Sequence, residues 1–152
     1  MSEHRAEIRW RRQTEDFEYD TYNRAHRWSF DSGVAFPATA AAEFKGDSEG
    51  VDPEEGFVAA VSACHMLTFL AIAARKRFTV DSYEDDAVGV LEKNEEGKLA
   101  ITRVTLHPRV RFGGDKEPDP QQLERLHHQA HEHCFIANSV RTKVEVAADA
   151  VA

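Results

Sequence analysis

The stretch VDPEEGFVAAVSACHMLTFLAIAAR, residues 51–75, decides the fold of this chain. It opens as a helix does, because Asp52 is a good N-cap, Pro53 suits the first helical position, and Glu55 stands where a capping box needs it. Residues 57–74 contain no charged side chain. An amphipathic surface helix would carry charge on one side, so we expect a central helix that is buried nearly all round.

The uncharged stretch reaches the length at which a helix could span a membrane. Its first half, however, is rich in Ala, Ser, Cys and His, and charged residues flank it closely on both sides. The flanking residues are Glu54 and Glu55 before the stretch and Arg75, Lys76 and Arg77 after it. We therefore interpret it as the central helix of a soluble domain, with no membrane partner.

Length and composition favour one soluble globular domain over residues 1–152. The chain is 41% hydrophobic and 30% charged, and its 152 residues suffice to bury a core without disulfide staples. A formal net charge of −8 argues against a nucleic-acid partner, since a basic patch supplies most of the affinity in such complexes. No signal-peptide pattern opens the sequence, so we expect a cytoplasmic location.

The part before the central helix predicts a small sheet. Residues 3–13 alternate apolar and charged side chains, which is the period of a half-buried strand. Residues 17–22 and 27–30 are candidates for a second and a third strand. Residues 31–50 show no period, and we interpret them as a long connection of the kind that is often functional or wraps a partner.

A hairpin is predicted after the central helix. Residues 87–91 and 99–106 have the pattern of its two arms, with Gly97 in the turn between them. Residues 109–112 extend the second arm. These strands would form a second antiparallel sheet region beside the helix.

A second helix and a last strand complete the predicted fold. Asp119, Pro120 and Gln122 repeat the helix-start pattern of a capping residue followed by proline. Residues 139–146 alternate in the manner of a strand. The order of elements therefore predicts an α+β fold, in which antiparallel sheets pack on a long central helix and a second helix.

The chain has two cysteines, Cys64 and Cys134. A lone cysteine in such a helix is better explained as a small apolar filler, since free cysteine is among the most buried residue types. Two facts favour thiol chemistry here: the cysteines could meet, and polar side chains lie beside each of them. Cys134 continues the apolar stripe of the second helix after Leu126 and Ala130, so both cysteines lie on helices that face the core and could meet. A reactive Cys64 would need a cation from elsewhere, because it lies too far from the helix N-terminus to gain from the helix dipole.

Histidines gather near both cysteines. His65 follows the first cysteine, and the second helix and its end carry His127, His128, His131 and His133. A zinc site built from these groups and the two thiols is an alternative to thiol chemistry. The sequence has no CxxC or HExxH motif, so we rank a metal site below thiol chemistry and expect no metal. For His127 and His128, solvated or helix-capping side chains are favoured over either kind of site.

Two motifs, one at each cysteine, resemble those of a known family. Residues 53–64 end in Cys64, and residues 130–138 surround Cys134. Both are similar to motifs of the OsmC/Ohr family, the osmotically inducible protein C and organic hydroperoxide resistance proteins, which are thiol peroxidases. The hydroperoxide branch usually has proline where Phe135 stands, and His65 is not typical of it. These departures bear on the substrate more than on the fold.

The resemblance implies a reaction and a set of site residues. Cys64 would attack a peroxide and become a sulfenic acid, and Cys134 would resolve it as a disulfide that an external dithiol reduces. Arg24 would supply the missing cation, and Glu54 would orient its guanidinium. The substrate would be an organic hydroperoxide, with hydrogen peroxide as a further candidate, and no cofactor is implied. A non-catalytic dimeric module of the same fold, binding a small apolar or thiol ligand, is the alternative.

The residues by themselves leave the roles of the charged pair open. Without the resemblance, Arg24 is better explained as an exposed strand-end charge, and Glu54 as a first-turn glutamate favoured by the helix dipole. Arg27 would then rival Arg24 as the activating cation. On one straight helix Glu54 and Cys64 lie roughly 15 Å apart along the axis and about 80° apart around it. Either the helix is broken near Gly56, or the Arg24–Glu54 pair reaches Cys64 from a second subunit. The resemblance implies an intertwined homodimer with active sites at its interface, which favours the second subunit.

Overall fold

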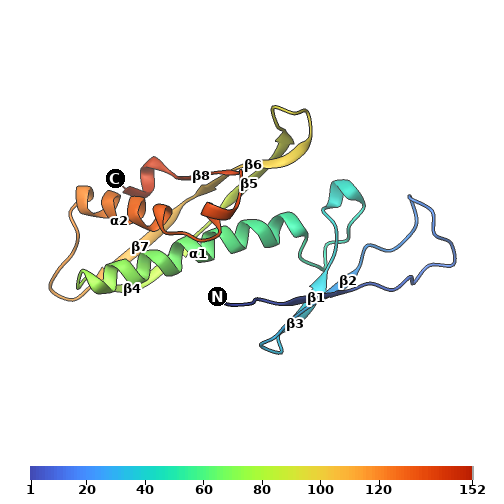
Figure 1. The fold of residues 1–152 in the computed structure, drawn as a ribbon, viewed down its shortest axis with the longest axis horizontal. Coiled ribbons are helices and arrows are strands. Elements are labelled where there is room, and N and C mark those ends of the chain that lie inside the picture. Colours follow the sequence, from blue (N-terminus) through green and yellow to red (C-terminus); the bar gives the residue numbers. More distant parts are fainter. Residues whose placement is uncertain (152) are drawn as a thin grey trace. The chain divides into compact units, whose positions relative to one another are not determined.

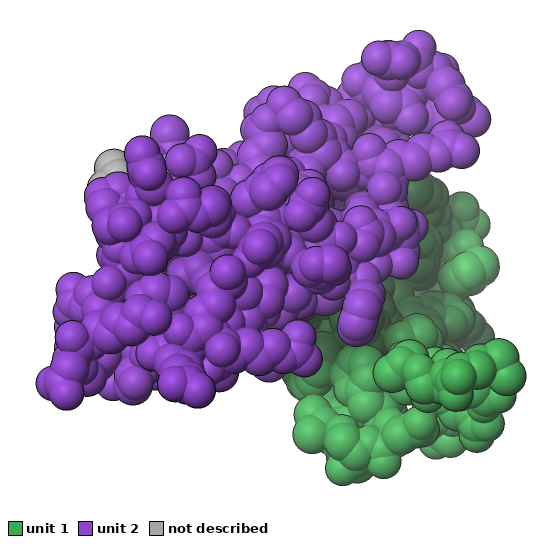
Figure 2. All heavy atoms as spheres, turned by 60° about the vertical axis from the view of Figure 1, so that its left-hand side comes forward, with its two compact units in different colours: residues 1–56 green, residues 57–152 purple. Residues whose placement is uncertain are grey.

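A computed structural model describes residues 1–151 of the chain. The chain divides into two compact units, residues 1–56 and the residues from Phe57 onward, which Figure 2 shows in green and purple. Helix α1 (Pro53–Arg75) begins at the end of the first unit and continues into the second. That residues 1–152 form a single domain stays a prediction.

The N-terminal unit is built on a three-stranded antiparallel sheet. Its strands are β1 (Ala6–Arg9), β2 (His26–Phe30) and β3 (Ala35–Ala38), with β2 in the middle. Trp28 of β2 pairs with Ile8 on one side and with Phe36 on the other. The first and third predicted strands are therefore confirmed as β1 and β2, although β1 is shorter than the alternating stretch.

Two predictions for this unit are wrong. Residues 17–22 form turns and irregular chain rather than a strand. Their aromatic side chains cluster instead of alternating across a sheet, with the Phe17 ring 5.8 Å from that of Trp10 and 5.2 Å from that of Tyr22. Residues 31–50 are not an unstructured connection, since they contain β3 and the 3-10 helix η1 (Ala42–Phe44).

Helix α1 starts as its first residues predict. The N–H of Glu55 donates to Asp52 Oδ1 at 2.7 Å, and the N–H of Asp52 donates to a carboxylate oxygen of Glu55 at 3.1 Å. This reciprocal pair is the predicted capping box, with Pro53 at the first helical position. The helix then continues to Arg75, with no break near Gly56.

Helix α1 is buried along one stripe, so the prediction of burial nearly all round is wrong for the chain by itself. Val61, His65, Phe69 and Ala73 repeat every four residues and are buried. On the opposite side Leu67 is 62% exposed. The two sheets and the second helix of the C-terminal unit cover one side of α1, so within residues 57–151 an uncharged face of the helix remains exposed.

The C-terminal unit contains a two-stranded and a three-stranded sheet. Strand β4 (Thr79–Asp85) pairs antiparallel with β7 (Pro108–Gly113). Strands β5 (Val88–Lys93) and β6 (Leu99–Leu106) form the predicted hairpin, and β8 (Lys143–Val146) joins β6 in parallel. Gly97 in the hairpin turn has a φ of 76°, which glycine adopts without strain.

Two details of these sheets differ from the prediction. Residues 109–112 do not extend the hairpin, because β7 pairs with β4 instead. Strand β8 is parallel to β6 rather than antiparallel, because the chain returns to the sheet through β7 and a helix, the kind of long connection that parallel neighbours require.

Helix α2 (Pro120–Glu132) lies beside α1 (Figure 1) and starts with the predicted capping box of Asp119 and Gln122. The buried core that joins the two helices to β4 and β7 consists of Phe69, Ala73, Phe78, Leu126 and Ala130. A second cluster, Val61, Val104 and Leu106, packs α1 against β6. Two short 3-10 segments, η2 (Ala137–Ser139) and η3 (Ala148–Val151), flank β8. The predicted α+β fold is confirmed.

Candidate functional site

The two cysteines come from different elements and lie next to each other. Cys64 is in α1 and partly exposed, whereas Cys134 lies just beyond the end of α2 and is 0% exposed. Both are free thiols. The Cys64 side chain is close enough to that of Cys134 to act on its ionisation. The fold thus brings together two thiols that are far apart in the sequence.

Cys134 is held as a neutral thiol. Burial raises its pKa above the ordinary value, the N–H of Ala137 opposes the rise by donating to Cys134 Sγ at 3.5 Å, and the neighbouring Cys64 thiol adds to the rise. A buried neutral thiol is a poor nucleophile toward a solute. Of the two thiols, Cys134 is therefore the one that a solute reaches and reacts with less readily.

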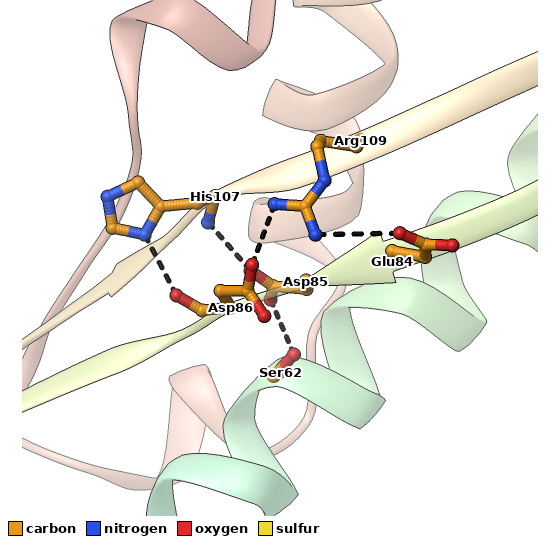
Figure 3. Close-up of polar contacts among 6 residues, drawn as sticks. All are labelled: Ser62, Glu84, Asp85, Asp86, His107 and Arg109. Atoms are coloured by element: carbon orange, nitrogen blue, oxygen red, sulfur yellow. Dashed lines mark hydrogen bonds and ion pairs between the residues drawn. The ribbon is translucent and has the colours of Figure 1, made fainter.

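Ser62, two residues before Cys64, belongs to the scaffold rather than to the thiol site. Its hydroxyl donates to Asp85 at the end of β4, and the other oxygen of Asp85 accepts the backbone N–H of His107 at 2.6 Å (Figure 3). One carboxylate therefore ties α1 to the corner between β6 and β7. This role could not be predicted from the sequence, because nothing in the neighbourhood of Asp85 distinguishes it from the many surface carboxylates.

A buried pair of histidines joins α1 to α2 beside the cysteines. His65 and His127 are 1% and 2% exposed, and His65 Nε2 lies 3.1 Å from His127 Nδ1. Their rings are nearly parallel, with 7° between the planes. His65 Nδ1 and His127 Nε2 are also buried, without a hydrogen-bond partner among residues 1–151.

Both imidazoles resist protonation. Burial lowers the pKa of His65 to about 4, with His131 lowering it further and Asp85 opposing the shift. Burial also lowers the pKa of His127 to about 4, and His65 adds to that effect. The prediction of a solvated or capping His127 is wrong, because this residue falls on the inward face of α2. His128, one residue along, is exposed as predicted.

Arg24 and Glu54 both lie in the N-terminal unit, and no ion pair of the described residues joins them. The guanidinium of Arg24 donates to the carbonyl oxygens of Tyr22 and Tyr19, each at 2.5 Å, and lies 3.7 Å from the centre of the Tyr22 ring. Glu54 is in the first turn of α1, where a glutamate favoured by the helix dipole belongs. Their pairing in a working site stays a prediction.

Two alternatives from the sequence, a zinc site and a membrane-spanning helix, can be compared with the structure. No three His, Cys, Asp or Glu side chains within residues 1–151 are grouped as ligands of a metal ion, so the zinc site gains no support. Helix α1 is long and apolar enough to cross a membrane by length and composition, a test that the core helix of a soluble protein also passes.

The fold and the site define the class: an α+β protein that presents two neighbouring free thiols, one from helix α1 and one just beyond the end of α2. A family model described as OsmC-like protein matches residues 46–149. The chain belongs to the OsmC-like protein family. No curated protein matches the chain significantly.

Solved structures agree with this assignment. An OsmC-like protein of unknown function from Vibrio cholerae is 51% identical, with a TM-score of 0.93, over 97% of this chain and 99% of that one. An organic hydroperoxide resistance protein OsmC from Legionella pneumophila is 18% identical, with a TM-score of 0.69, over 97% and 98% of the two chains. The organic hydroperoxide resistance protein OhrB of Bacillus subtilis is 23% identical, with a TM-score of 0.66, over 96% and 98%. The last two likenesses establish the fold.

Proposed function

We propose that this protein is a cysteine-based peroxidase that reduces organic hydroperoxides. The observation that carries the proposal is the pair of neighbouring free thiols, Cys64 partly exposed and Cys134 buried. Membership of the OsmC-like family supports it, as does a fold shared with proteins named for organic hydroperoxide resistance. We place the reaction in the cytoplasm, a reducing compartment that keeps such thiols available.

In the first step Cys64 reacts as a thiolate. Its sulfur forms a bond to one oxygen of the hydroperoxide while the O–O bond breaks, and the other oxygen takes a proton and leaves as an alcohol. The sulfur is oxidised to a sulfenic acid, and the peroxide is reduced. Partial exposure makes Cys64, rather than Cys134, the thiol that a solute can reach.

In the second step Cys134 resolves the sulfenic acid. Its sulfur bonds to that of Cys64 while the S–O bond breaks, and the oxygen leaves as water with the thiol proton. An external dithiol then reduces the disulfide and is itself oxidised to a disulfide. Because Cys134 is buried, we expect this reductant to attack the sulfur of Cys64.

The activating cation is assigned to a second copy of the chain. Proteins of this family are typically homodimers, and α1 leaves an uncharged face exposed in the chain by itself. The unbroken α1 separates Glu54 from Cys64 by roughly 15 Å along the axis, so the Glu54 and Arg24 of one chain are proposed to serve the Cys64 of its partner. The Arg24 guanidinium would then exchange its carbonyl partners for Glu54 and the thiolate.

An anaerobic titration with cumene hydroperoxide tests the reaction. We expect the loss of two thiols per chain at one equivalent of peroxide, of one thiol in Cys134→Ser, and of none in Cys64→Ser. Identical samples without peroxide are the control for air oxidation. If the wild-type chain keeps both thiols, the peroxidase proposal is wrong and a non-catalytic module is favoured.

Mixed dimers test the assignment to a second subunit. Arg24→Ala and Cys64→Ser chains are each expected to be inactive, whereas their heterodimer has one complete site and should regain up to half of the activity. Arg27→Ala is the matched control, since Arg27 lies exposed on the neighbouring strand β2. Heterodimers without activity would place the whole site within one chain.

A further inference from the structure

One buried contact between α1 and α2 is made by polar side chains, whereas buried contacts between helices are usually apolar. His65 and His127, only 1% and 2% exposed, meet with 3.1 Å between Nε2 and Nδ1. The ring of His127 also stacks on Phe69, one turn further along α1, with 4.5 Å between the ring centres. A side chain of α2 thus contacts residues on two successive turns of α1.

This contact is directional. Burial holds the pKa of each imidazole at about 4, so both rings are neutral near pH 7. A hydrogen bond between neutral imidazoles requires an N–H and a lone pair in line, and it therefore fixes both the distance and the orientation of the two helices. An apolar contact would hold the helices together but leave them freer to slide. A single buried polar residue fixes register in this way in coiled coils.

The two cysteines lie where the register of these helices matters. Cys64 directly precedes His65, and Cys134 follows His127 by about two helical turns. A slide of α2 by one residue would carry Cys134 about 1.5 Å along the helix axis. A disulfide tolerates little of this, because the two Cβ atoms must lie about 3.5–4.5 Å apart.

We propose that the His65–His127 hydrogen bond is a register lock, and that both histidines are positioning residues for the thiol pair. The lock holds α2 at the one register in which Cys134 lies against Cys64. A role of the lock in catalysis, namely fast resolution of the sulfenic acid, rests on the proposed peroxidase function. The effect of the lock on disulfide formation between the two thiols is independent of that function, because it exists without any peroxide.

A glutathione redox buffer measures the lock directly. The ratio of Cys64–Cys134 disulfide to dithiol gives the effective concentration of one thiol at the other. In His65→Phe/His127→Phe both hydrogen-bonding rings are replaced by apolar rings, so no buried polar atom loses its partner. We expect the ratio to fall by about tenfold or more, which is about 30 mV in the potential of the pair.

Conservative variants separate a directional role from a merely structural one. The amide of Gln reaches the position of His65 Nε2, and that of Asn reaches the position of His127 Nδ1. His65→Gln and His127→Asn are therefore expected to keep the ratio within about threefold of the wild-type value. His128→Phe, which makes the same change on the exposed face of α2, should leave the ratio unchanged.

A folded double Phe variant whose ratio falls less than tenfold overturns the register lock. If circular dichroism shows that this variant does not fold, His127→Asn is compared instead with His127→Leu, because Leu has the shape of Asn without its amide. Equal ratios of disulfide to dithiol in these two variants overturn the proposal. Because no peroxide is present, a lock that fails this test leaves the peroxidase proposal standing. The opposite outcome is also distinguishable. If the double Phe variant shows the expected fall in the ratio of disulfide to dithiol but the wild-type chain does not consume peroxide, only the peroxidase proposal is refuted.

Discussion

The buried histidine pair makes the stability of the folded chain depend on pH. In an unfolded chain each imidazole titrates near pH 6.5, whereas burial holds the pKa of His65 and of His127 at about 4 in the folded chain. Between these values the unfolded state binds more protons. The stabilising contribution of the neutral pair is therefore complete above about pH 6.5, falls as the pH drops toward 4, and does not fall further below that.

The size of this effect follows from the same values. At pH 5 the unfolded imidazoles are almost fully protonated and the folded ones are mostly neutral, which costs about 2 kcal/mol of unfolding free energy per histidine. The two together account for roughly 4 kcal/mol, a large part of the 5–15 kcal/mol by which native proteins are stable. The pKa of His65 at about 4 already includes the neighbouring His131, which lowers it, and Asp85, which raises it.

Urea unfolding at pH 7.5 and pH 5.0 measures this dependence. The wild-type chain is expected to lose about 4 kcal/mol more than His65→Phe/His127→Phe, which has no buried imidazole to protonate. The protein concentration is held constant, because unfolding of a dimer depends on it. His128→Phe removes an exposed histidine and should behave as the wild type does. Equal losses in the wild type and the double variant would refute the reasoning.

Two further predictions concern the thiols and the second helix. Iodoacetamide should modify Cys64 in the folded chain, but Cys134, which is 0% exposed, only in denaturant. Mass spectrometry of the two cysteine-containing peptides measures the labelling. Equal labelling of both cysteines without denaturant would contradict the observed burial. Asp119→Ala should lower the unfolding free energy by about 1 kcal/mol, because it removes the acceptor of the Gln122 N–H at the start of α2; an unchanged urea midpoint would show that the cap contributes nothing.

Local chemistry made parts of the fold predictable. The starts of both helices follow from capping residues and proline, because these act within four residues of chain. The hairpin around Gly97 follows from its turn. The aromatic stretch at residues 17–22 shows the limit, since its alternation comes from a loop cluster around Trp10 and not from a sheet.

Features that depend on distant residues were not predictable. That β8 joins β6 in parallel depends on the path of the whole chain between them. The exposed face of α1 could not be predicted from the composition of the helix. An uncharged face indicates that something covers the helix, but it does not indicate whether the same chain or a second copy provides the cover. Asp85 acquires its role only where β4 ends beside Ser62.

The sequence by itself determined the starts of both helices, the hairpin around Gly97 and the family motifs around Cys64 and Cys134, because capping, turns and periodicity are encoded within a few neighbouring residues. Only the tertiary structure decided which groups meet: the two thiols, and the pairing of His65 with His127, for which the sequence had favoured a solvated or helix-capping side chain. The physical reason is that burial and hydrogen bonding across two helices depend on their packing, and packing is a property of residues far apart in the chain.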